Sequence, residues 1–182
     1  MALKSTQSIL LVGALMISGA GAAPEPENYS VLLAPDESTW CGYRSQSEFK
    51  SAADNAQPEV TARITYSGAE ITEVIHQVTP QSGDWLLVDR YALATDVVTV
   101  RRTNLFAQNQ VQVVQEAAIR GGTVSAFHVV EVSTLDGIKT ALPSNLDFPD
   151  VKVVVALSAS PFVRIADEMR RNSLGKLCRK FD

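Results

Sequence analysis

Between residues 59 and 132, apolar and polar side chains alternate with a period of two, and short groups of turn residues interrupt the alternation. The expected turns lie at residues 67–68, 94–96, 107–109 and 121–122. Because successive side chains of a strand point to opposite faces, this pattern predicts strands that are joined by tight turns into an antiparallel meander. Connections this short leave no room for helical crossovers, so the pattern excludes a doubly wound parallel sheet.

The alternation predicts six strands, and a later apolar run adds a seventh. They are residues 60–66, 69–75, 85–93, 97–106, 111–120, 123–132 and 151–157. The first two form the clearest hairpin, because a turn at residues 67–68 places Ile64 opposite Ile71 on one apolar face.

Two segments have helical periodicity instead. Ser45 and Glu48 match the capping box that begins a helix, and the apolar residues behind them predict a short helix over residues 46–55. Ser160 followed by Pro161 is a typical helix start, and the apolar stripe after it predicts a C-terminal helix.

Length and composition fit one globular domain. Hydrophobic residues make up 46% of the chain and charged residues 20%, which excludes wholesale disorder. We therefore expect a single α+β domain over residues 23–182. Its sheet is an antiparallel meander of six to seven strands, strongly twisted or curled, with a short N-terminal helix and a C-terminal helix packed on it.

Residues 1–22 have the three parts of a secretory signal peptide. Lys4 supplies the positive charge, an apolar stretch follows, and Ala20-Gly21-Ala22 gives the small residues of a cleavage site after Ala22. The apolar stretch falls short of the roughly 20 residues that a membrane-spanning helix needs. The sequence thus predicts a protein exported to the periplasm or the extracellular space, without a membrane span.

Export makes the two cysteines informative. Cys41 lies in an acidic part of the chain and Cys178 in a basic part, so the local charges favour bringing the two thiols together. An even cysteine count in an oxidising compartment predicts one disulfide, Cys41–Cys178, and the alternative is two free thiols.

Motifs of catalytic and metal chemistry are scarce. The chain has two histidines, His76 and His128, each expected on a mostly apolar strand face, and we predict no metal site and no cofactor. Neither a nucleophile elbow nor a phosphate-binding glycine motif occurs. A spatial triad of either histidine with Asp84 or Asp89 is left open, and with it a small secreted hydrolase.

One strand suggests a binding surface. Trp85, Asp89 and Tyr91 fall on the same face of the strand at residues 85–93, and aromatic rings beside a single carboxylate are typical of a ligand pocket or partner surface. The alternative is core packing, with Asp89 near the frayed part of the strand or paired with Arg90, Arg101 or Arg102. A basic group near the C-terminus is expected to be a solvated helix surface; it comprises Arg164, Arg170, Arg171, Lys176, Arg179 and Lys180.

These observations favour a non-catalytic binding module that acts on a protein or an envelope component through its sheet surface. The net charge of −4, which becomes −5 when Lys4 leaves with the leader, argues against a nucleic-acid partner. Two alternatives remain open at this point. One is a carrier of an apolar small ligand or lipid inside a curled sheet, and the other is the hydrolase.

Overall fold

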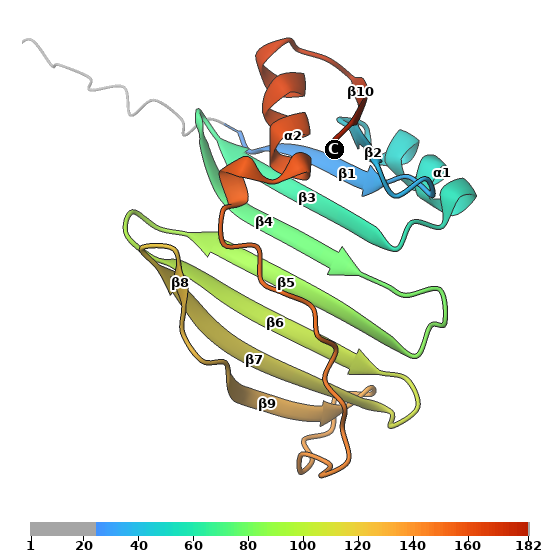
Figure 1. Ribbon diagram of the computed structural model, residues 1–182, viewed down its shortest axis with the longest axis vertical. Helices are drawn as coiled ribbons and strands as arrows, with labels where there is room; N and C mark the ends of the chain where they lie inside the picture. The colour runs from blue at the N-terminus through green and yellow to red at the C-terminus, as the bar shows by residue number, and fades with distance from the viewer. Residues whose placement is uncertain (1–24, 182) are drawn as a thin grey trace, which may run out of the picture.

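The computed structural model describes residues 25–181, so the predicted leader and its cleavage site lie outside the described residues. Within that range the chain forms one open sheet of ten strands with two α-helices (Figure 1). The order across the sheet is β10-β2-β1-β3-β4-β5-β6-β7-β8, and β9 also pairs with β7. The strands are β1 (Glu27–Leu33), β2 (Thr39–Tyr43), β3 (Val60–Ser67), β4 (Glu70–Val78), β5 (Trp85–Leu93), β6 (Val98–Phe106), β7 (Val111–Arg120), β8 (Thr123–Val124), β9 (His128–Thr134) and β10 (Lys176–Lys180).

The central meander, β3 to β7, confirms the antiparallel sheet and the α+β class. The bounds of β5 and β7 match the expected strands, because each of these strands buries one face under other parts of the chain. The predicted number of six to seven strands is wrong, and the sheet does not close on itself.

The strands that sequence analysis missed lie at the N- and C-terminal ends of the described chain. β1 carries four successive buried residues, Tyr29 to Leu32, because both of its faces are covered, so it shows no alternation. β2 and β10 are only five residues each, too short for a periodic pattern to stand out. β1 pairs with β3, so β1, β2 and β10 extend the meander on one side.

The predicted register of the first hairpin is also wrong. Ile64 lies opposite Val74 and not opposite Ile71. The turn begins one residue later than expected, at Gly68, whose φ of 57° suits a two-residue hairpin turn. Thr72 forms a bulge in β4, and this extra residue lets both Ile71 and Val74 pack against the core.

Two expected strands are replaced by irregular structure. The run at residues 123–132 is broken at 125–127 into β8 and β9. Residues 151–157, predicted as a strand, form none. Residues 151–156 belong to a long irregular stretch, residues 135–156, here called the crossing segment, which runs over the face of the sheet toward α2 (Figure 1), and the 3₁₀ helix η1 (Leu157–Ala159) follows it. The crossing segment forms one isolated bridge to β9, between Lys139 and Ser133, and residues 151–156 pair with no strand.

The helices α1 (Gln46–Ala56) and α2 (Pro161–Arg171) confirm the two predicted helices. α2 buries its apolar stripe on the face of β1 that carries Val31. It approaches β2 so closely that a Cβ on Gly42 would lie 2.5 Å from Cγ2 of Ile165. α1 lies on the opposite face, where the Ser30 hydroxyl donates a hydrogen bond to Gln46 at 3.2 Å.

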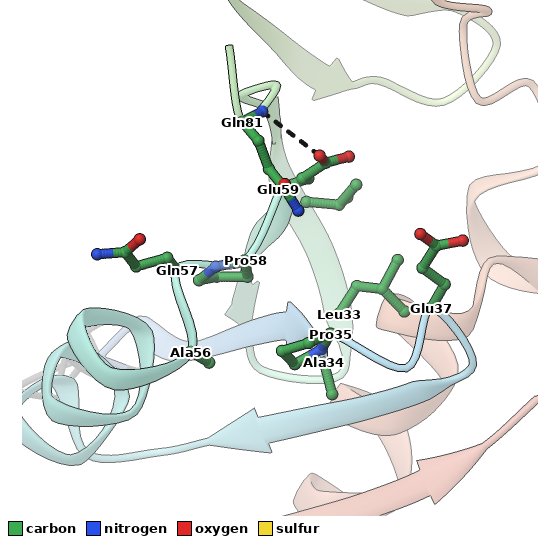
Figure 2. A pocket seen from close by; sticks show the side chains of 10 residues that line it. Leu33, Ala34, Pro35, Glu37, Ala56, Gln57, Pro58, Glu59 and Gln81 are labelled. Atoms are coloured by element: carbon green, nitrogen blue, oxygen red, sulfur yellow. Dashed lines mark hydrogen bonds between the residues drawn. The ribbon is translucent and has the colours of Figure 1, made fainter. Parts of the chain in front are cut away.

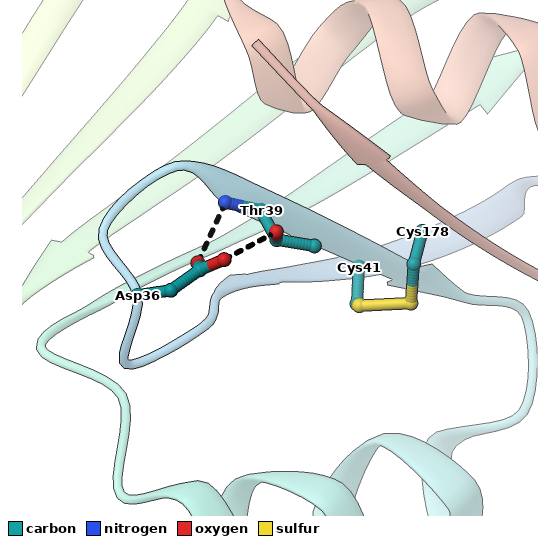
Figure 3. The surroundings of a disulfide bond; sticks show 4 residues. All are labelled: Asp36, Thr39, Cys41 and Cys178. Carbon is teal, nitrogen blue, oxygen red and sulfur yellow. Dashed lines mark hydrogen bonds between the residues drawn. A yellow bond between two sulfur atoms is a disulfide. The ribbon is translucent and has the colours of Figure 1, made fainter.

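The predicted disulfide is confirmed. Cys41 of β2 and Cys178 of β10 are bonded and lie opposite each other, with their Cα atoms 4.1 Å apart (Figure 3). The nearby turn between β1 and β2 is closed by Asp36, whose carboxylate accepts hydrogen bonds from the backbone and the hydroxyl of Thr39 at 2.8 and 2.7 Å. These hydrogen bonds hold the pKa of Asp36 well below its usual value.

Candidate functional site

The three side chains grouped as a binding patch share one face of β5, but the structure does not place them together. Asp89 and Tyr91 are fully buried beneath the crossing segment. The Tyr91 hydroxyl accepts a hydrogen bond from the Val154 backbone N–H of that segment at 3.0 Å, and it donates a longer one of 3.4 Å to Asp89. Trp85 is half-buried at the beginning of the strand, in a separate apolar cluster.

Asp89 is one half of a buried ion pair. Nε and one terminal nitrogen of Arg102 each donate to a carboxylate oxygen of Asp89 at 2.7 Å. The Asp89 side chain is 0% exposed and the Arg102 side chain 9%. The Arg102 guanidinium also lies 4.9 Å from the ring centre of Phe127. Such a planar two-point contact satisfies the buried carboxylate and fixes how β5 and β6 face the core.

The imidazole of His76 lies opposite Asp89 on the neighbouring strand. It is 7% exposed and stacks on Phe162 with a centroid distance of 5.5 Å, and its Nδ1 has no hydrogen-bond partner. Burial lowers the pKa of His76 in spite of the nearby Asp89 carboxylate, so the folded protein holds the imidazole neutral. A catalytic base must reach its proton donor by a hydrogen bond, and Nδ1 of His76 makes none within residues 25–181.

A hollow of about 530 Å³ lies where β5 begins, β6 ends and the crossing segment passes. We call it the Trp85 hollow. Three aromatic rings and three carboxylates line it: Trp85, Phe106 and Phe148, and Asp84, Asp147 and Asp150. Three side-chain amides complete most of the lining: Gln108, Asn109 and Asn145. Its size falls within the range of small-molecule and side-chain pockets.

The aromatic wall of the Trp85 hollow is built across two distant parts of the chain. The rings of Phe106 and Phe148 meet edge to face, with centroids 5.5 Å apart. Phe106 is buried at the end of β6, whereas Phe148 is 36% exposed on the crossing segment. One wall is thus held by the sheet and the other by the crossing segment.

The charged side chains that line the Trp85 hollow are all negative. Its lining contains no lysine or arginine. Among residues 25–181, none of its three carboxylates has a salt-bridge partner within 4.0 Å. Asp84 accepts one hydrogen bond, from the Gln108 amide at 3.1 Å. The hollow therefore offers negative charge beside aromatic rings.

Sequence analysis found Trp85 and missed its partners in the crossing segment. Asp147, Phe148 and Asp150 lie in a stretch that has no periodic pattern. A signal was nevertheless available, because long connections without regular structure are uncommon in compact domains and are often binding loops.

Most of the basic side chains near the C-terminus are engaged within the protein. Arg179 pairs with Glu168 and Lys180 with Asp36, at 2.6 and 3.5 Å. Three others lie over aromatic rings: Arg164 over Phe181, Arg170 over Tyr66 and Lys176 over Tyr43. These contacts use the positive charges locally and give no separate binding site.

Residues 25–181 contain neither a cluster of metal ligands nor a helix that could span a membrane. No group of three His, Cys, Asp or Glu side chains in residues 25–181 is arranged to hold a metal ion. In the same range, neither helix has the length and apolar character needed to cross a membrane. Comparison with protein-family models, with curated proteins and with solved structures found no match to this chain.

Proposed function

We propose that this protein is an exported, non-catalytic binding module, and that it binds a positively charged segment of a protein in the Trp85 hollow. The export rests on the predicted leader and is supported by the disulfide, which persists in oxidising compartments. The choice of ligand rests on the charge and the aromatic lining of the hollow.

The observation that carries the proposal is the set of unpaired carboxylates. On the face of the sheet opposite the crossing segment, two acidic side chains are paired across strands: Glu73 lies 3.4 Å from Arg90, and Glu116 lies 2.5 Å from Arg101. The carboxylates of the Trp85 hollow have no such partner in the described chain. A cationic ligand supplies the charge that is missing there.

The aromatic rings favour the same ligand class. A guanidinium or ammonium group over a ring face is attracted by the ring quadrupole, most strongly by tryptophan. Arginine adds planar stacking and two-point hydrogen bonding to a carboxylate. Trp85 and Phe148 beside Asp147 therefore match an arginine side chain better than a neutral or acidic one.

The test compares two labelled octapeptides that are identical except that one carries arginine and the other citrulline, which has nearly the same shape without the charge. Binding is measured by fluorescence anisotropy at low and high salt. We expect the arginine peptide to bind at least about fivefold more tightly, and we expect this preference to shrink with salt. Equal affinity for the two peptides would show that charge does not select the ligand, and the proposal would then be wrong.

Two matched variants locate the site. The double substitution Asp147→Asn with Asp150→Asn removes two negative charges from the Trp85 hollow, and we expect it to weaken arginine-peptide binding by about fivefold or more. The substitutions Glu70→Gln, at the beginning of β4, with Asp96→Asn, in the β5–β6 turn, remove the same charge from the opposite end of the sheet. If both double variants lose affinity equally, the interaction is a general charge effect and not binding in this hollow.

A further inference from the structure

A second hollow lies at the same end of the sheet, and its lining has a different chemistry (Figure 2). We call it the Glu59 hollow. It encloses about 360 Å³ between the β1–β2 turn, the end of α1, the beginning of β3 and the β4–β5 loop. Aliphatic side chains make its walls, among them Leu33, Pro35, Pro58 and Val60. It has no aromatic ring in its lining.

Two carboxylates, of Glu37 and Glu59, give the Glu59 hollow its charge, and its lining has no lysine or arginine. Neither has a salt-bridge partner within residues 25–181. The Gln81 backbone N–H donates to the Glu59 carboxylate at 3.4 Å, which orients that side chain on the wall (Figure 2). Lys180, a nearby base, is paired with Asp36.

An aliphatic wall with carboxylates beside it matches a lysine side chain. Lysine lays its methylene stem along apolar surface and keeps its ammonium group in water or on a carboxylate. The Glu59 hollow therefore suits an alkylammonium group, whereas the aromatic Trp85 hollow suits a guanidinium.

The two hollows lie at the same end of the sheet. Val60 at the beginning of β3 pairs with Val78 at the end of β4, and the β4–β5 loop contributes Gln81 to one hollow and Asp84 to the other. The nearest lining strands of the two hollows are β3 on one side and β5 and β6 on the other, which are two to three strand spacings apart. At about 4.8 Å a spacing this is roughly 10–14 Å, which an extended peptide covers in about three to four residues.

We propose that one extended basic segment of a partner protein occupies both hollows, with an arginine in the Trp85 hollow and a lysine in the Glu59 hollow, three or four residues apart. This inference rests on the proposed function and adds the spacing and identity of the two basic residues. Each hollow contributes a weak contact with the peptide. Once one basic residue is bound, the short peptide connection makes binding of the other effectively intramolecular, so a peptide with both residues binds more tightly than a peptide with either one alone.

The test uses labelled peptides in which arginine and lysine are one, three, four or ten residues apart, in both sequence orders, together with a peptide that carries arginine alone. We expect the peptides with spacings of three or four, in one order, to bind at least about fivefold more tightly than the single-arginine peptide. A spacing of one residue is too short to reach both hollows. If affinity is independent of spacing, the two hollows do not act together and the inference is wrong.

Variants separate this inference from the proposed function. Glu37→Gln with Glu59→Gln should reduce the affinity of the two-charge peptide to that of the single-arginine peptide and leave the single-arginine peptide unaffected. Asp147→Asn with Asp150→Asn should weaken both peptides. If only the second pair of substitutions has an effect, the Trp85 hollow is the sole site: the proposed function stands and the two-hollow inference falls. If arginine and citrulline peptides bind alike, both fall.

Discussion

Replacing Arg102 by methionine tests the role of the buried ion pair most directly. The substitution keeps a long apolar side chain but removes the charge that two 2.7 Å hydrogen bonds deliver to Asp89, which is 0% exposed. An uncompensated buried carboxylate costs about 3–5 kcal/mol. In a domain of this size, where 1 kcal/mol corresponds to about 2–4 °C, the melting temperature should fall by roughly 6–20 °C.

The control is the same substitution one residue earlier in β6. Arg101 pairs with Glu116 on the face opposite the crossing segment, with a side chain that is 45% exposed, and exposed pairs contribute about 0–1 kcal/mol. Both variants are unfolded in urea with the disulfide oxidised. If Arg102→Met loses no more stability than Arg101→Met, the burial of the Asp89–Arg102 pair does not raise its contribution to stability, and the reasoning is refuted.

A double variant completes the cycle. Asp89→Leu with Arg102→Met removes both charges, so no buried charge is left without a partner. Buried ion pairs that are replaced by apolar residues of similar volume often leave stability unchanged or raise it. The double variant should therefore be more stable than Arg102→Met alone, with a coupling free energy of roughly 1–3 kcal/mol between the two sites. Simple addition of the two single effects would contradict this expectation.

Three further outcomes can be measured by the same unfolding assay. Gly42→Ala should cost about 1–3 kcal/mol, because its new Cβ would lie 2.5 Å from Ile165; an unchanged urea midpoint would show that α2 can shift freely. Cys41→Ser with Cys178→Ser should lower the free energy of unfolding by up to roughly 4–5 kcal/mol, because the disulfide closes a loop of 137 residues. An unchanged free energy of unfolding would mean that the disulfide does not constrain the unfolded chain. Burial lowers the pKa of His76 in the folded protein, so the unfolded chain takes up the proton at a higher pH than the folded one. Stability is therefore lost as the pH falls below about 6.5, with a slope of at most about 1.4 kcal/mol per pH unit. His76→Gln should flatten the stability profile between pH 5 and 7, and identical profiles for the two proteins would contradict the assignment.

Alternation predicted those strands that bury one face only. β3 alternates between apolar and polar residues because Ala62, Ile64 and Tyr66 are buried on one side while Arg63 and Ser67 on the other side are exposed. β1 has cover on both faces, from α2 on one and α1 on the other, so its sequence carries no period. The run at residues 151–157 has strand-like composition, but it lies over the face of the sheet, where the Val154 N–H donates to the Tyr91 hydroxyl of β5. The composition of a segment thus indicates whether it is buried, whereas its pairing with a strand depends on where the fold places its backbone.

The candidate site was predictable only where it lies on regular structure. Trp85 was found because it begins a strand that the sequence predicts, and Asp84 directly precedes it. Asp147 and Phe148 come to the hollow through contacts between parts of the chain that are some sixty residues away in sequence. No local pattern encodes such contacts, and only the length of the irregular connection pointed to them.

The fold gives the three residues of the sequence-predicted patch different physical roles. The crossing segment has no regular hydrogen-bond ladder, so its position depends on a few contacts with the sheet. Two of these are the edge-to-face contact of Phe148 with Phe106 and the hydrogen bond from the Val154 N–H to the Tyr91 hydroxyl. That hydroxyl also contacts Asp89, whose carboxylate is oriented by Arg102. Asp89 and Tyr91 therefore act below the surface, where they help to position the segment that completes the hollow beside Trp85.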